Sequence, residues 1–174
     1  MRNHKILLFF GILAALGGSA HAQSSSSASA TAQATVVQPI QITATGGTLD
    51  FGQVAASAAG GGTVTLNPAT NAITTTGSVT AFSSSGTAAA FSVTGLSGAN
   101  YQLSFSPGST ITLTSGANTM SLALTAYVNG GSALTNLPLT GGSQTVKVGG
   151  ALTLGSNQAA GNYSGNFTLT AQYQ

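Results

Sequence analysis

Very few side chains in this sequence can carry acid–base, redox or metal chemistry. The 174 residues include no cysteine, one acidic residue, three basic residues and two histidines. Beyond residue 22 only Asp50 and Lys147 are charged, because the other ionisable groups of these types are Arg2, His4, Lys5 and His21. General acid–base catalysis needs groups that titrate near the working pH, and zinc sites need several Cys, His or carboxylate ligands. We therefore expect a non-enzyme with no catalytic, metal-binding or cofactor-binding residues, and no cofactor.

The two remaining charged residues do not point to a site. Lys147 is the sole candidate base for a serine or threonine nucleophile, but its place in an alternating run predicts a solvent-facing strand position. Asp50 lies between Leu49 and Phe51, which share the opposite strand face. A surface or turn carboxylate is the favoured interpretation, since calcium takes about six to eight oxygen ligands.

The first 22 residues have the pattern of a secretory signal peptide. A basic head is followed by an apolar run, Ile6 to Leu16, and by the small-x-small sequence Ala20-His21-Ala22. Cleavage after Ala22 would leave a chain whose two charges cancel, so no nucleic-acid partner is expected. The apolar run is too short to span a bilayer, so no stable membrane span is expected after cleavage. We predict export, with the periplasm in transit and the cell surface or the extracellular space as destination.

Residues 23–35 form a low-complexity arm of Gln, Ser, Ala and Thr. Such a composition lacks the apolar area to fold alone. Every second residue from 28 onward is nevertheless small and apolar, so an extended arm would carry one continuous stripe. This stripe is the candidate donor strand, Ala28, Ala30, Ala32, Ala34 and Val36. The alternative interpretation is a flexible Ser/Ala linker.

Residues 36–174 read as a single all-β domain. Short runs rich in Val, Ile, Thr, Phe and Tyr alternate with Gly, Asn and Ser clusters, and no helix is indicated. About ten short strands of this spacing predict an antiparallel β-sandwich or barrel. Pro39 places the first strand at an edge or a bend, and Val148–Ala151 is expected to form a hairpin turn because it contains Gly-Gly.

The carboxyl-terminal segment is the strongest functional signal. Its pattern predicts one long strand in which alternate residues share a face, and it ends with a penultimate tyrosine. Gly161 lies about fourteen residues from the end. The candidate chaperone or assembly strand comprises Gly161, Tyr163, Phe167, Leu169, Ala171 and Tyr173.

This segment resembles the terminal signature of chaperone–usher pilus subunits. The resemblance implies an immunoglobulin-like antiparallel β-sandwich that lacks one strand, which the arm of another subunit completes. It also implies a periplasmic chaperone and an outer-membrane usher as partners. Pilin donor arms carry bulkier alternating residues, and many pilins have a disulfide, so the alanine stripe and the absence of cysteine depart from that pattern.

A second resemblance covers most of the chain from Thr35 to Tyr173. The sequences Val36-Val37-Gln38-Pro39-Ile40, Leu49-Asp50-Phe51-Gly52 and Gln158 to Gly165 are similar to those of a secreted, cysteine-free bacterial family, domain of unknown function 4402. That family implies no biochemical role.

The sequence thus predicts an exported, fimbria-like or pilus-like structural subunit that self-associates or joins sister subunits by strand donation. An alternative is a monomeric, secreted module that binds glycan or protein, for example in cell adhesion, through loops such as Ala55–Gly62 or Ser83–Ala88. A further alternative is a matrix amyloid, which low charge would favour.

Overall fold

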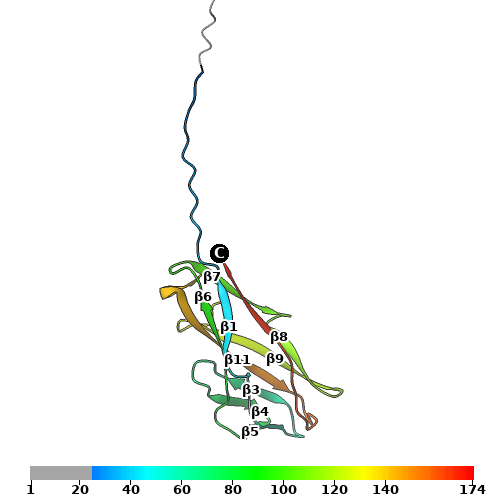
Figure 1. Ribbon diagram of the computed structural model, residues 1–174. Coiled ribbons are helices and arrows are strands. Elements are labelled where there is room, and N and C mark those ends of the chain that lie inside the picture. Colours follow the sequence, from blue (N-terminus) through cyan, green and yellow to red (C-terminus); the bar gives the residue numbers. More distant parts are fainter. Residues whose placement is uncertain (1–24) are drawn as a thin grey trace, which may run out of the picture. The chain divides into compact units, whose positions relative to one another are not determined.

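A computed structural model describes residues 25–174 (Figure 1). The chain divides into two units, of which the second, Val36–Gln174, contains all the described strands. The expected signal peptide lies outside the described residues. Within residues 25–174 there is no α-helix, and hence none long and apolar enough to cross a membrane.

Twelve strands and one short 3₁₀ turn make up the second unit. In chain order they are β1 (Gln41–Gly46), β2 (Val54–Ala56), β3 (Gly62–Leu66), β4 (Ile73–Gly77), β5 (Val79–Ala81), β6 (Ala89–Thr94), β7 (Asn100–Ser106), β8 (Thr110–Ser115), β9 (Asn118–Tyr127), β10 (Leu137–Pro138), η1 (Thr140–Gly142), β11 (Ser143–Leu154) and β12 (Thr168–Tyr173).

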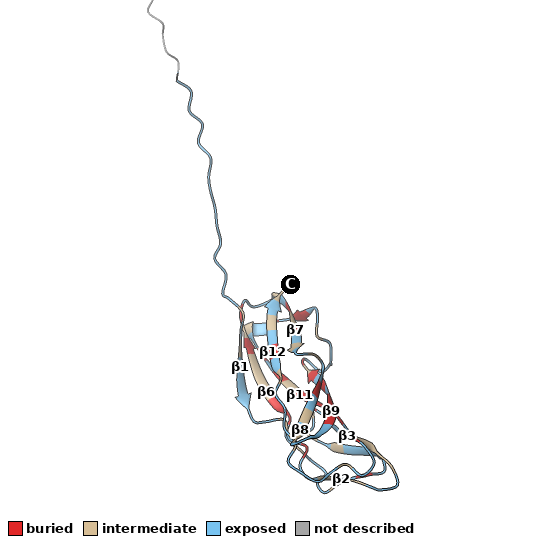
Figure 2. Ribbon diagram, turned by 90° about the vertical axis from the view of Figure 1, so that its right-hand side faces the viewer, coloured by how far each residue is buried: buried red, intermediate tan, exposed pale blue. Residues whose placement is uncertain are grey.

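The strands form an antiparallel sandwich whose two main layers differ in size. The larger sheet has β11 at its centre, paired with β9 along one side and with β6 and then β3 along the other. Strands β1, β4 and β8 complete this sheet at its margins. The smaller sheet has the order β10-β7-β12. A two-stranded ribbon, β2-β5, lies at the end of the unit opposite the carboxyl terminus (Figures 1 and 2).

The core lies between the larger and the smaller sheet and follows the alternation of the sequence. Along β9 and β11 every second side chain is buried, as in Leu122 and Val146, because a strand alternates its faces. Tyr101 and Leu103 of β7 and Leu169 of β12 are the buried counterparts in the smaller sheet. The predicted all-β sandwich is therefore confirmed, and Pro39 does precede an edge strand.

Two expectations about strands are wrong. The Gly149-Gly150 pair is no hairpin turn, because β11 runs straight through it. The glycines instead allow the neighbouring backbone to approach closely, since a Cβ at Gly150 would collide with the Ala123 carbonyl oxygen of β9. The long terminal strand is also shorter than expected and begins only at Thr168.

The chain before β12 takes a different course because it crosses to another strand. Ser164 pairs with Thr114 of β8 through two backbone hydrogen bonds of 2.9 and 3.0 Å. Gly165 permits this crossing, since a Cβ there would come within 2.8 Å of the Thr112 carbonyl oxygen and of the Leu113 side chain. The terminal segment therefore touches both sheets in turn.

Candidate functional site

Two strand edges on one side of the sandwich have no partner among the described residues. β1 is the last strand of the larger sheet and pairs only with β6, while β12 is the last strand of the smaller sheet and pairs only with β7. Figure 2 shows these two strands on the same side of the unit, coloured mainly as exposed and intermediate. Unpaired edges present free backbone donors and acceptors to any incoming chain.

The register identifies which backbone groups of β12 point outward. In an antiparallel pair, hydrogen-bonded and non-hydrogen-bonded residue pairs alternate. Gln174 donates to Asn100 of β7 at 3.1 Å, so Gln172 and Thr170 belong to the hydrogen-bonded set. Consistently, Leu103, which lies opposite Ala171, donates away from β12 to Leu134. The outward groups are therefore those of Leu169, Ala171 and Tyr173.

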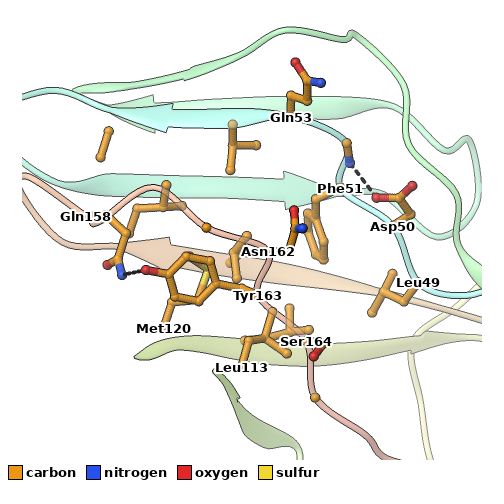
Figure 3. Close-up of a pocket in the computed structure, with 18 of the residues that line it drawn as sticks. Leu49, Asp50, Phe51, Gln53, Leu113, Met120, Gln158, Asn162, Tyr163 and Ser164 are labelled. Atoms are coloured by element: carbon orange, nitrogen blue, oxygen red, sulfur yellow. Dashed lines mark hydrogen bonds between the residues drawn. The ribbon is translucent and has the colours of Figure 1, made fainter. Parts of the chain in front are cut away.

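A cleft of about 960 Å³ is lined by the segments that adjoin these two strands in the sequence, although by no residue of β1 or β12 themselves. One wall is the segment Thr48–Ala56, which follows β1, and the other is Gln158–Gly165, which precedes β12 (Figure 3). The floor is the inner face of the larger sheet, formed by Ile111, Leu113, Met120, Leu122, Leu152 and Leu154. No residue of the smaller sheet lines this cleft, and its floor side chains are buried apart from Leu113, which is half-buried. We call the two edges and the cleft together the open side.

The cleft walls are held by local hydrogen bonds. The Tyr163 hydroxyl donates to the Ala159 carbonyl oxygen and accepts from the Gln158 amide, both at 2.8 Å. On the opposite wall, an Asp50 carboxylate oxygen accepts from the Gly52 backbone at 2.8 Å (Figure 3). Asp50 is exposed and its backbone pairs with Thr87, so this carboxylate stabilises a turn, as the sequence predicts.

Aromatic side chains pack where the two layers meet beside the open side. Phe167 lies edge-on to Phe91 of β6 and to Phe105 of β7, with ring centroids 6.2 and 6.0 Å apart. All three are only partly buried. A core residue is normally covered from all sides, so part of the surface of this cluster remains accessible.

The sequence-predicted site residues are brought together only in part. Phe167, Leu169, Ala171 and Tyr173 lie on or next to β12, whereas Tyr163 lies in the cleft wall. Gly161 is exposed beside Ser115, where a Cβ would collide with the serine hydroxyl. The stripe from Ala28 to Val36 is fully exposed and forms no strand. The floor residues of the cleft were not predicted as site residues, since their alternation indicates only core.

The loops of the alternative interpretation are hydrogen-bonded into the fold. In Ser83–Ala88, Ser85 bridges to Ala72 and Thr87 bridges to Asp50. In Ala55–Gly62, Ser57 bridges to Gly60. Ser83 and Ser84 also line a second, more open hollow of about 380 Å³ beside β4 and β5.

The hydroxyl of Tyr173 joins three parts of the chain at the end of β12. It accepts a hydrogen bond from the Leu96 backbone at 2.5 Å and donates one to the Gln38 carbonyl oxygen at 2.9 Å. Gln38 precedes β1, so the penultimate tyrosine fixes the point at which residues 36–40 leave the sandwich.

Replacing Tyr173 with phenylalanine should lower the free energy of unfolding by about 1–2 kcal/mol, because this half-buried side chain loses two hydrogen bonds. Urea unfolding measures this change. The matched control is Tyr127→Phe on β9, whose hydroxyl makes no hydrogen bond within the described chain and which should change stability by less than about 0.5 kcal/mol. Equal effects of the two substitutions would contradict the role assigned to Tyr173.

The fold and the site together define an antiparallel β-sandwich with one open side. The chain belongs to the family described as domain of unknown function (DUF4402), whose model matches residues 40–173, so the family resemblance seen in the sequence is confirmed. No curated protein and no solved structure matches the chain.

Proposed function

We propose that the protein is an exported, non-catalytic structural subunit that assembles into a fimbria-like fibre or surface layer by strand addition at the open side. The observation that carries the proposal is the unpaired edge of β12, together with a neighbouring cleft that has an apolar floor and partly polar walls. A strand placed there would pair with the outward groups of Leu169, Ala171 and Tyr173 and cover the core.

The arm supplies a strand of suitable chemistry. Its alternating alanines would enter the open side while the serines and threonines between them face solvent. Alanine adds little buried area, so most of the affinity would come from main-chain hydrogen bonds and from Val36. A net charge near zero beyond residue 22 further favours association over dispersion in solution.

The same edge suits a periplasmic chaperone during export. A chaperone strand on β12 would shield the open side until a sister subunit replaces it, with an outer-membrane usher as the place of exchange. An unshielded edge of this kind promotes aggregation. A chaperone bound to β12 would prevent it during export.

The test uses residues 36–174, which form a compact unit, and a synthetic peptide of residues 24–37. The truncated chain should stay monomeric, whereas the chain from Gln23 assembles. At a peptide concentration one hundred times its Kd, binding should stabilise the truncated chain by about 2.7 kcal/mol. This corresponds to a rise in Tm of roughly 5–10 °C.

The control is a peptide of identical composition in which the alanines no longer fall on alternate positions. It should raise Tm far less, because its small residues would face both ways. If the arm peptide fails to bind and both chains remain monomeric, strand addition is wrong and the monomeric binding module becomes the better account.

A further inference from the structure

The exposed large hydrophobic side chains of the described residues lie at two opposite ends of the second unit. Val36, Val37 and Leu96 retain 96, 49 and 40% of their surface, and Phe82 retains 69%. Elsewhere in residues 25–174 the large apolar side chains are buried or half-buried. A single exposed apolar side chain is ordinary, whereas apolar side chains that gather on one surface mark a candidate contact site.

The first end lies at the carboxyl terminus of β12. Because the Tyr173 hydroxyl bonds to both the Leu96 backbone and the Gln38 carbonyl oxygen, Leu96 and the Val36–Val37 pair lie close together. The arm continues from this end, since Thr35 directly precedes Val36. We call Val36, Val37 and Leu96 the root end.

The second end lies at β5, far from the carboxyl terminus (Figure 1). Phe82 directly follows β5, and its backbone donates to the Gln53 carbonyl oxygen at 3.0 Å. Both residues line the cleft. Phe82 therefore stands at the mouth of the open side, at the end away from Tyr173.

We propose that the root end of one copy packs against Phe82 of the next copy, so that the subunits join head to tail. This inference rests on the proposed function. When the arm of a second copy enters the open side beside Phe82, the root end of that second copy comes to lie against the Phe82 side chain. Because such an interface joins two different patches, it does not form a closed two-fold symmetric dimer. Repeated head to tail, it generates an open fibre.

Strand direction favours a second copy over the chain's own arm. β12 runs from the cleft toward the root end, as its chain order and Figure 2 show. An incoming arm whose Val36 stays beside Phe82 runs in the opposite direction and pairs antiparallel with β12. The chain's own arm would start from the root end and pair parallel, which is slightly less stable for each residue.

The arm is long enough for this connection. Residues 25–35 span at most about 36–40 Å when extended. The six residues of β12 cover about 20 Å. The arm can therefore follow β12 and the adjoining cleft while its root end remains outside, against Phe82.

The absence of cysteine permits a direct test by disulfide formation. In a Phe82→Cys, Leu96→Cys double variant of the chain from Gln23, oxidation should give a ladder of covalent multimers. Each single variant should give none, and an equal mixture of the two should stop at dimers. A disulfide needs Cα atoms within about 7 Å, so a second variant provides an independent readout.

That second variant is Phe82→Asp, matched by Thr80→Asp at an exposed position of β5. The first should raise the protein concentration needed for assembly at least tenfold, and the second should leave it nearly unchanged. If Phe82→Asp and Thr80→Asp raised the concentration needed for assembly equally, or if Phe82→Cys alone gave dimers, the head-to-tail contact would be wrong. Fibres that still form in that case would leave the proposed function standing. If the unmodified chain forms no assemblies and does not bind the arm peptide, the proposed function fails as well.

Discussion

Replacing Ala171 with proline should abolish assembly while the sandwich remains folded. The backbone N–H of Ala171 points away from β7, so proline removes no hydrogen bond of the existing ladder. Proline is tolerated on edge strands whose missing donor faces solvent. It would remove one donor from the middle of the outward set and place a ring where an incoming strand must lie.

The matched control is Gln172→Pro, one residue further along β12. Gln172 belongs to the hydrogen-bonded set with Gln102 of β7, so its N–H is required by the fold itself. This substitution should destabilise the domain by about 1–3 kcal/mol or more. Sedimentation separates the assembly states, and circular dichroism follows folding. An Ala171→Pro chain that is folded and still assembles would show that β12 is not the site of strand addition.

The second large effect is expected at the buried pair of Tyr101 and Gln144. Tyr101 is fully buried, and its hydroxyl donates to the Gln144 side-chain oxygen at 2.8 Å. The Gln144 amide donates in turn to the Pro138 carbonyl oxygen at 2.5 Å. Every buried polar side-chain atom within residues 25–174 has such a partner. This link connects the larger sheet with β7 and β10.

Replacing Gln144 with leucine should cost about 2–6 kcal/mol, because a buried hydroxyl and a carbonyl oxygen both lose their partners. The Tyr101→Phe, Gln144→Leu double variant should recover part of this loss, since no unpaired hydroxyl remains. A double-mutant cycle from urea unfolding measures the coupling. Purely additive losses would contradict a direct link between the two side chains.

Tyr101 should also govern stability at alkaline pH. Burial raises the pKa of its hydroxyl above the ordinary value. The unfolded chain therefore loses this proton first, and stability present below about pH 10 falls as the pH rises through the pKa of the folded state. Tyr101→Phe should flatten this decline. An unchanged alkaline slope would show that this phenol does not titrate differently in the two states.

Much of the fold could be predicted because alternation reports directly on burial. Every second residue along most of β7 and β9 is apolar, and β6 has the bounds expected from its sequence. β4 was missed because its three consecutive threonines are all exposed and show no period. The hairpin turn predicted at Gly149 and Gly150 was wrong because glycine permits both a turn and the close approach of two backbones. Only the position of the neighbouring strand decides between the two.

The candidate site was predicted less completely for a similar reason. The residues of β12 could be chosen from their alternation, but alternation continues through Tyr163 and Gly165, where the chain crosses to β8. The cleft lies between Thr48–Ala56 and Gln158–Gly165, and nothing in the sequence of either segment indicates that the two face each other. Phe82 was not singled out, since a lone aromatic residue beside serines is equally typical of a core strand.

Amide hydrogen exchange of residues 36–174 tests most directly whether the open side takes up a strand. In the free chain, the amides of Leu169, Ala171 and Tyr173 should exchange fast, while those of Thr170 and Gln172 are protected by β7. Saturating arm peptide should slow the first set and leave the second unchanged. Protection of both sets before the peptide is added, or rapid exchange of the outward set after it binds, would contradict the account.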